Sequence, residues 1–221
     1  QGEARGIRVD SSDGFTRLRY NSDNSYVEPT GGSLGGLLTA RDELINPRKA
    51  ELNTLAAEFA WQTNKIHNTG RGLTGLTSIT ANTAIDPNYI EKPLDIAVVD
   101  QLSLGNLYKP QNGTMTIEVK NENSGDTSLA YIDVTLIGNN KTSLKDLLDQ
   151  INQIPEMTAS IDTFGKLSIE SGTGYSFYIK EDTSNTSSFL GLNNFFDGND
   201  ASTININSTI KESPNFLAAG K

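Results

Sequence analysis

The chain has 221 residues, a length that fits one large or two modest domains, each with a hydrophobic core of its own. Its formal net charge is −9 and its basic residues are scattered, which excludes the positive surface that nucleic acids and anionic membranes attract. The absence of cysteine excludes disulfides, thiol nucleophiles and cysteine-bound metals. No run approaches the roughly 20 apolar residues of a membrane helix. Because the chain does not begin with Met, we expect a fragment or processed piece of a longer protein.

A β-hairpin is predicted for residues 7 to 29. Alternating apolar residues mark two extended arms, and Asp13-Gly14 supplies a tight turn between them. Pro29 and Gly31-Gly32 then end the extended segment. The apolar residues of the hairpin are Ile7 and Val9 on one arm and Phe15, Leu18 and Tyr20 on the other.

Two consecutive helices are predicted after the hairpin. The first occupies residues 34 to 45, and Gly35-Gly36 thins it so that another backbone can approach. Asn46 is predicted to stop this helix, and Pro47 to restart the chain as a second helix in a new direction. That second helix runs to about residue 69 and ends at Gly70.

Both predicted helices carry apolar residues at steps of three and four, so each has an apolar stripe. Part of each stripe is expected to pack within the chain. The remainder needs a covering helix, either from a segment beyond the ends of this chain or from a neighbouring copy. The predicted packing seam comprises Leu34, Leu37, Leu38, Leu44, Leu52, Leu55, Phe59 and Ile66.

Strands dominate from about residue 84 onward. Residues 115–119 are predicted to form a half-buried strand, and strands near 132–136, 159–169, 175–179 and 204–206 follow. A single helix between them begins with a capping box at Ser143 and Asp146. The sequence thus predicts an α+β protein: a helical segment with a small β-hairpin region, followed by an antiparallel α+β domain with one helix packed on the sheet.

Three patterns that resemble functional motifs have simpler structural explanations. Residues 70–75 match G-x-G-x-x-G, but they follow a helix instead of preceding one, so a helix C-cap is predicted. His67 is the single histidine, and we predict a hydrogen-bonded residue that fixes the helix end. The acidic turns lack the spacing of a calcium loop. We therefore assign no catalytic, metal-binding or cofactor-binding residue and no small-molecule substrate.

Two separated segments carry a family resemblance. Residues 31–75 begin with Gly-x-Leu-Gly-Gly-Leu, continue through Arg41-Asp42 and end in Asn-x-x-His-x-x-Gly at Asn64, His67 and Gly70. Both this segment and residues 187–220 resemble the bacterial flagellar first hook-associated protein. Residues 113–171, between them, are similar to a strand–strand–helix–hairpin unit shared by several flagellar axial proteins. The second segment contains the string Leu-Gly-Leu-Asn-x-Phe-Phe-x-Gly, with Leu192, Asn193, Phe195, Phe196 and Gly198.

The resemblance implies a non-enzymatic building block of the hook–filament junction. It implies export through the flagellar secretion channel, assembly into a tubular layer outside the cell, and contacts with copies of itself, with the hook protein and with the neighbouring junction protein. It also implies that this chain lacks both terminal helical segments of the family. On this basis residues 1–84 are predicted to form a helical wall domain with an N-terminal β-hairpin, 85–212 an outer antiparallel α+β domain, and 213–221 the start of a truncated returning helix.

Three alternatives remain open at the level of sequence. The first is another flagellar axial protein, such as the filament or hook subunit, because the central unit is shared. The second is a cell-surface adhesin or glycan-binding module, which the Asn- and Thr-rich strands would suit. The third is a hydrolase that uses His67.

Overall fold

The computed structural model describes residues 5–11, 16–97 and 109–220. The chain divides into two compact units, Gln1–Leu52 and Asn53–Lys221. Helices and antiparallel strands occur together, so the predicted α+β class is confirmed. No helix of the described residues is long and apolar enough to cross a membrane.

The first unit begins with the predicted hairpin. Strand β1 (Ile7–Asp10) pairs antiparallel with β2 (Arg17–Tyr20), and Ile7 lies opposite Tyr20. Arg19 fixes the hairpin from its side, since its guanidinium binds the Asp10 carboxylate at 2.5 Å and lies 4.0 Å from the centre of the Tyr26 ring. The predicted turn at Asp13-Gly14 and the neighbouring Phe15 lie outside the described residues.

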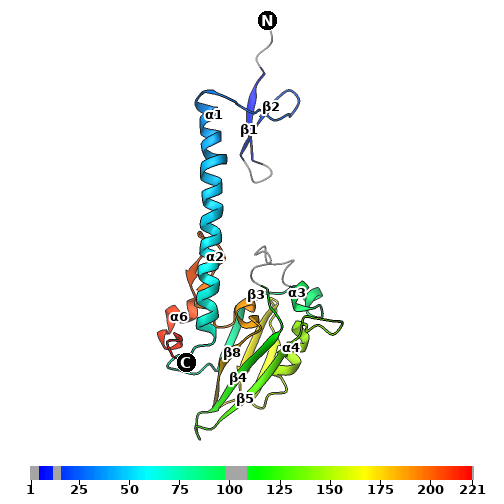
Figure 1. The fold of residues 1–221 in the computed structure, drawn as a ribbon, viewed down its shortest axis with the longest axis vertical. Coiled ribbons are helices and arrows are strands. Elements are labelled where there is room, and N and C mark those ends of the chain that lie inside the picture. The colour runs from blue at the N-terminus through cyan, green and yellow to red at the C-terminus, as the bar shows by residue number, and fades with distance from the viewer. Residues whose placement is uncertain (1–4, 12–15, 98–108, 221) are drawn as a thin grey trace. The chain divides into compact units, whose positions relative to one another are not determined.

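The prediction that Pro47 redirects the helix is wrong. Helix α1 (Gly32–Thr39), the π-helical segment η1 (Ala40–Ile45) and α2 (Asn46–Asn68) follow one another without a loop (Figure 1). Asn46 does not cap a new helix, because its backbone is right-handed helical and its N–H bonds to the Arg41 carbonyl, five residues back. Proline lacks an N–H and clashes with the carbonyl four residues earlier in a regular helix. The wider π turn before Pro47 changes that spacing and lets the helix continue.

Close backbone packing at the paired glycines is confirmed for Gly35 and not for Gly36. A Cβ atom on Gly35 would lie 2.9 Å from the Pro29 carbonyl oxygen, whereas a Cβ on Gly36 would meet nothing within 4 Å. The neighbouring backbone at Gly35 is therefore the chain's own entry segment into α1.

The second unit contains two three-stranded antiparallel sheets, where the sequence predicted one. One sheet has the order β3-β7-β6 and the other β5-β4-β8, and a backbone bridge between Leu76 and Phe177 links them. Figure 1 shows β4, β5 and β8 side by side. The strands are β3 (Ser78–Ala84), β4 (Gly113–Asn121), β5 (Thr127–Val134), β6 (Met157–Ile161), β7 (Lys166–Ser171) and β8 (Tyr175–Asp182).

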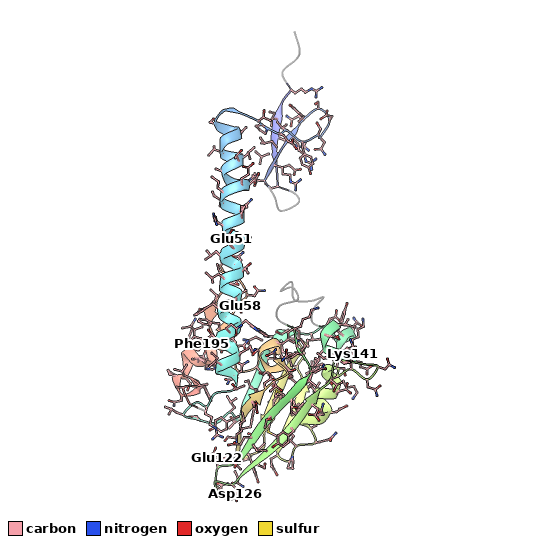
Figure 2. All side chains as sticks on the ribbon, in the orientation of Figure 1. Glu51, Glu58, Glu122, Asp126, Lys141 and Phe195 are labelled. Atoms are coloured by element: carbon pink, nitrogen blue, oxygen red, sulfur yellow. The ribbon has the colours of Figure 1, made fainter. Side chains whose placement is uncertain are left out.

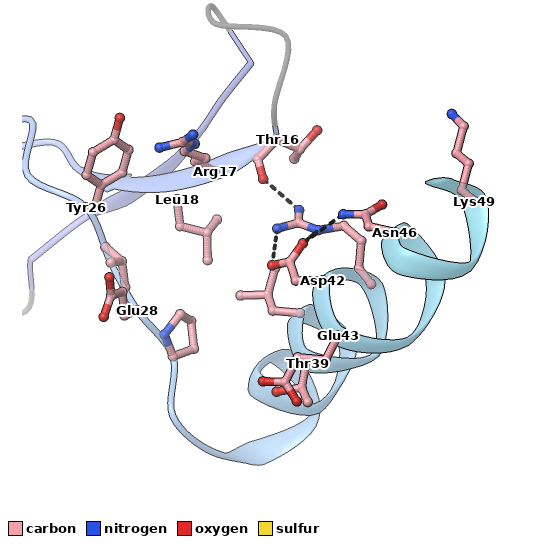
Figure 3. A pocket seen from close by; sticks show the side chains of 14 residues that line it. Thr16, Arg17, Leu18, Tyr26, Glu28, Thr39, Asp42, Glu43, Asn46 and Lys49 are labelled. Carbon is pink, nitrogen blue, oxygen red and sulfur yellow. Dashed lines mark hydrogen bonds and ion pairs between the residues drawn. The ribbon is translucent and has the colours of Figure 1, made fainter. Parts of the chain in front are cut away.

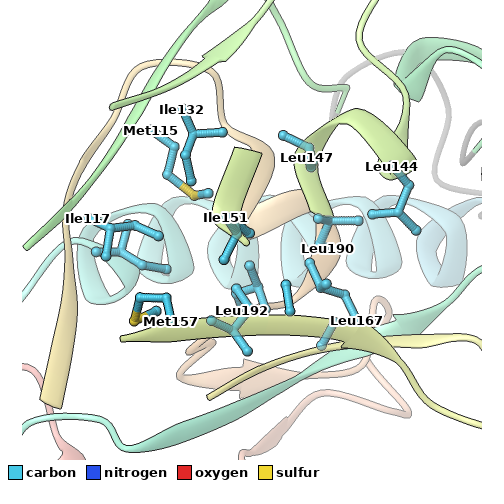
Figure 4. Close-up of a cluster of buried hydrophobic side chains, with 14 of the residues drawn as sticks. Met115, Ile117, Ile132, Leu144, Leu147, Ile151, Met157, Leu167, Leu190 and Leu192 are labelled. Atoms are coloured by element: carbon cyan, nitrogen blue, oxygen red, sulfur yellow. The ribbon is translucent and has the colours of Figure 1, made fainter. Parts of the chain in front are cut away.

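Helix α4 (Leu144–Ile151) joins the two sheets into one core. Its predicted capping box is confirmed, because the Ser143 hydroxyl accepts from the Asp146 N–H while the Asp146 carboxylate accepts from the Ser143 N–H. The helix packs on β5 of one sheet and on β6 of the other. Its fully buried residues, Leu144, Leu147 and Ile151, lie among core side chains of both sheets (Figure 4).

The remaining elements are short. They are η2 (Pro87–Tyr89), α3 (Leu94–Ala97), α5 (Thr186–Leu190), β9 (Phe196–Asp197), β10 (Asn205–Ile206), α6 (Ser208–Glu212) and η4 (Pro214–Phe216). The helix predicted to start at Ser213-Pro214 is a single 3₁₀ turn in the described residues. The chain leaves the helical conformation at Leu217 because the following backbone pairs with another segment, Gly220 with Arg71.

The prediction of a half-buried strand at residues 115–119 is wrong for its polar positions. Glu118 points away from the apolar core, yet it is only 4% exposed. Arg71, which follows α2, and Lys180, on β8, cover it; both pair with its carboxylate, and the Lys180 Nζ lies 3.0 Å from Oε2. Burial acts to raise the pKa of Glu118, but the hydrogen bonds and charges of Lys180 and Arg71 outweigh it and lower the pKa.

Replacing Glu118 with Gln should lower the free energy of unfolding at pH 7 by about 1–2 kcal/mol. Hydrogen bonds to charged groups contribute somewhat more than this, but Arg71 and Lys180 are 39% and 48% exposed, so solvent screens part of the interaction. The lowered pKa places the stabilisation above the ordinary glutamate value of about 4.3, and it is lost as the pH falls through the folded-state pKa. Urea denaturation at pH 7 and at pH 3 measures both effects. Glu181→Gln, at an exposed position of β8, is the matched control and should change little.

Candidate assembly site

An exposed apolar stripe runs along α2. Leu52, Leu55, Phe59 and Ile66 are separated by three, four and seven residues, which places them on one face of the helix. Leu55 is 66% exposed and Ile66 is 70% exposed. Large apolar side chains that share one helix face and remain in water are typical of a helix that packs against a partner.

The earlier part of the predicted seam is also largely exposed. Leu34 and Leu37 on α1 and Leu44 on η1 are exposed, and Leu38 is half-buried. We use the term helix seam below for these four residues together with the four on α2. The described residues contain no helix that covers it, and the seam remains a prediction as an assembly surface.

The opposite face of α2 is polar and buried in the second unit. Asn64 binds both backbone polar groups of one residue, since its Nδ2 donates to the Phe196 carbonyl at 3.0 Å and its Oδ1 accepts from the Phe196 N–H at 2.8 Å. One turn later, Asn68 donates to Ser188 Oγ and to Asn194 Oδ1. In Figure 2, Phe195 lies beside the C-terminal half of α2. These amides attach the helix to residues 188–196, more than 100 residues further along the chain.

His67 completes this polar face. Its Nδ1 lies 2.8 Å from the Asn193 carbonyl oxygen, and its Nε2 accepts from the Ala218 N–H at 3.0 Å. Nδ1 therefore carries the proton and the ring is neutral. Burial lowers the pKa of His67, and the bond to the Asn193 carbonyl, which acts in the opposite direction, does not compensate. The prediction of a hydrogen-bonded residue that fixes the helix end is confirmed.

The two signature strings that the sequence placed far apart thus meet at one site. Asn64 and His67 come from the first string, and Asn193, Phe195 and Phe196 from the second. The Phe195 and Phe196 rings lie edge to face with centres 4.6 Å apart, and Phe196 also contacts the seam residue Phe59 at 5.4 Å. We call Asn64, His67 and Asn68 the polar clamp. Leu192 is fully buried in the core, and Gly198 has a φ of +81° in the turn between β9 and β10.

Sequence reasoning missed Asn68 and the backbone partners of the clamp. Asn64, His67 and Asn68 are spaced at i, i+3 and i+4, which puts three polar side chains on the face opposite the apolar stripe. That spacing was a usable signal for Asn68. Nothing in the sequence indicates that Asn194, Ser188 and the Ala218 N–H are the groups they meet.

The G-x-G-x-x-G string serves close packing in addition to ending α2. A Cβ atom on Gly70 would lie 2.8 Å from the Ala218 Cβ, and one on Gly72 would collide with the Asn215 carbonyl. Gly75 lies against Ser176 of β8 in the same way. The three glycines therefore let residues 213–220 and β8 approach the backbone that follows α2.

Arg41 and Asp42 belong to the first unit and form a bidentate pair, with Nε to Oδ1 at 2.7 Å and Nη2 to Oδ2 at 2.8 Å. Arg41 also donates to the Thr16 carbonyl at 2.7 Å, so it ties the helix to the hairpin (Figure 3). The hydrogen bonds from Arg41 lower the pKa of Asp42. A cavity of about 880 Å³ opens beside this pair, with Tyr26, Glu28 and Lys49 in its lining.

Among the described residues, no group of three or more His, Asp or Glu side chains is placed to hold a metal ion. Both nitrogens of His67 bind backbone groups.

Two family models match this chain, one over its helical part and one over part of its β-rich region. Residues 3–80, which hold the hairpin, the continuous helix and the start of β3, match the helical domain of the flagellar hook-associated protein FlgK. Residues 114–173, from β4 to the end of β7, match the flagellin hook IN motif. The chain is thus a structural protein of the bacterial flagellum, as both matched families are.

Within that class, the two matches support a FlgK-like flagellar hook-associated protein. The resemblance of residues 31–75 and of the central unit is confirmed, while that of residues 187–220 lies outside both matches. A comparison with curated proteins finds no match.

Proposed function

We propose that this chain is a building block of the hook–filament junction and assembles into a tubular layer through its helix seam. The observation that carries the proposal is the exposed stripe of Leu52, Leu55, Phe59 and Ile66 on α2. A helix of another subunit that covered this stripe would remove large apolar side chains from water, and each fully buried side chain contributes about 1.5–3 kcal/mol.

The proposal gives the helical part and the β-rich part of the chain different positions in the tube. Residues 1–84 would form the tube wall, residues 85–212 an outer domain, and residues 213–221 the segment that returns to the wall. The partners would be copies of the same protein, the hook protein and the neighbouring junction protein. The protein would act outside the cell after export through the flagellar channel, as a structural component and not as an enzyme.

A filament or hook subunit is the alternative that the comparisons keep open. Residues 114–173 match a motif named for flagellin and hook. The match of residues 3–80 to the FlgK helical domain favours the hook-associated role.

Replacing Leu55 with Glu should block assembly while the protein stays folded. Leu55 is exposed, so the substitution leaves the core intact, but it would place a charge at the centre of the covered seam, where burial of an unpaired charge is strongly unfavourable. In a flagellated host that carries the variant in its own junction protein, we expect hooks without filaments and loss of swimming. Electron microscopy of the hook end and a swimming assay measure this result.

Thr54→Glu is the matched control. Thr54 is also exposed and precedes Leu55 directly, so it receives the same charge on the same helix outside the stripe. We expect cells that carry Thr54→Glu to swim and to assemble filaments normally. Normal filaments on Leu55→Glu cells, with an unchanged melting temperature of the purified chain, would contradict the proposal.

A further inference from the structure

The C-terminal segment 213–220 is attached to the end of α2 and the residues after it by hydrogen bonds, and its Phe216 side chain packs against the hydrophobic core. Its backbone bonds to the residues that follow the helix: Leu73 N–H donates to the Asn215 carbonyl at 2.8 Å, and Arg71 and Gly220 exchange bonds of 2.7 and 3.2 Å. Between these two contacts, the Ala218 N–H donates to His67 Nε2. Close approach at Gly70 and Gly72 brings the two backbones together.

The bond at Ala218 requires a neutral imidazole. Nδ1–H already donates to the Asn193 carbonyl, so an added proton can only go to Nε2. The protonated nitrogen would then face the Ala218 N–H, and two donors would point at each other without an acceptor. His67 is 5% exposed, which leaves the imidazolium little access to water in that position.

We infer that His67 is a proton-sensitive latch, which holds residues 213–220 against the end of α2 when its ring is neutral and releases them when the ring is protonated. Release lets the ring reach water and accept a proton, whereas the attached state excludes the proton. The inference concerns how this chain holds its own segment, and it does not depend on the assembly proposal.

Among the described residues, the segments that contact the ring contribute no carboxylate that would stabilise its charged form. Residues 189–196, which pack on the ring through Asn193 and the Phe195 side chain, include no charged residue, and residues 213–220 include none. On its own helix and the exit from it, the nearest charged residues are Lys65 and Arg71, both cationic. Arg71 is paired with Glu118 of β4. The pKa of His67 is therefore set by burial, which lowers it, against the bond to the Asn193 carbonyl, which raises it.

The sign of the pH dependence follows from this arrangement. The folded-state pKa of His67 is lower than its ordinary value of about 6.5, so the attached state is fully stabilised above about pH 6.5. The stabilisation is lost as the pH falls from there through the folded-state pKa. Within that interval the released population should rise by up to about tenfold per pH unit, because release is coupled to the uptake of one proton.

A nuclear magnetic resonance titration from pH 7.5 to pH 4.5 tests the latch directly. His67 is the only histidine, so a sample labelled with ¹⁵N at histidine gives one unambiguous pair of ring signals. At pH 7.5 we expect a protonated Nδ1 and an unprotonated Nε2. Hydrogen exchange of the Ala218 and Gly220 amides, corrected for the intrinsic effect of pH, should lose protection by about tenfold per unit below pH 6.5. The Ile117 amide in β4 should keep its protection over the same range.

His67→Gln is the matched variant, since a glutamine side chain offers an amide oxygen as a non-titrating acceptor. Its Ala218 and Gly220 amides should show no pH-dependent loss of protection. Protection of Ala218 that stays constant while the wild-type ring gains its proton would overturn the inference. Loss of protection at Ala218 and Ile117 together would also overturn it, because the event would then be global unfolding. The wild-type titration decides the question by itself if the variant does not fold.

Discussion

Replacing Asn64 with Ala is expected to lower the free energy of unfolding of the second unit by about 2–4 kcal/mol. The Asn64 amide is 6% exposed and satisfies both the N–H and the C=O of Phe196. Its removal leaves two partly buried backbone groups without this partner, and an unsatisfied buried group costs about 1–3 kcal/mol. The higher helix propensity of alanine offsets only a few tenths of that loss. Thermal and urea denaturation of the purified chain measure the change.

The control for this prediction lies two residues earlier. Gln62 is exposed on the same helix, and its amide donates to Glu58 at the surface, so Gln62→Ala should change the free energy of unfolding by less than about 0.5 kcal/mol. Equal effects of the two substitutions would show that the polar clamp is not what attaches α2 to residues 193–196.

Replacing Gly165 with Ala should have the largest effect of the substitutions considered, about 3–5 kcal/mol of destabilisation. Gly165 has a φ of +79° in the turn between β6 and β7, a conformation that costs a residue with a Cβ about 1–2 kcal/mol. The new Cβ would also collide with the Ile85 carbonyl. The backbone would have to move away, which weakens the 2.7 Å bond from the Ile85 N–H to the Gly165 carbonyl.

A substitution at Gly138 separates the cost of the positive φ from the cost of the steric collision. Gly138 has a similar φ of +84°, but a Cβ there would meet nothing within 4 Å. Gly138→Ala should therefore cost only the conformational part, about 1–2 kcal/mol. The difference between the two variants, measured by urea denaturation, reports the close approach at Ile85. A difference near zero would contradict the steric explanation.

Local signals predicted the elements that depend on neighbours in the sequence. The hairpin at residues 7–20 followed from alternation, and α4 followed from its capping box and its apolar face. The stripe of Leu52, Leu55, Phe59 and Ile66 followed from helical spacing, and the structure leaves it exposed as expected. In each case the decisive interactions lie within one turn or one strand pair, so the residue string contains them.

The continuous passage through Pro47 shows where local rules were insufficient. Proline normally ends a helix, and a cap at Asn46 was a sound inference from the string. The π-helical segment Ala40–Ile45 removes the conflict by widening the turn before the proline. Such π-helical segments are rare, and no residue pattern predicts them.

By itself, the sequence determined the α+β class and the order of most helices and strands, and it singled out Asn64 and His67 and predicted the helix seam. Only the tertiary structure decided that the second unit contains two three-stranded sheets and that Glu118 is buried beneath Arg71 and Lys180. It also decided that Asn64 and His67 bind the backbone of residues 193–196, about 130 residues away. The physical reason is the range of the interactions. Periodicity and capping act between close neighbours, whereas burial of a charge or pairing of an amide depends on which distant backbone the completed fold brings against it.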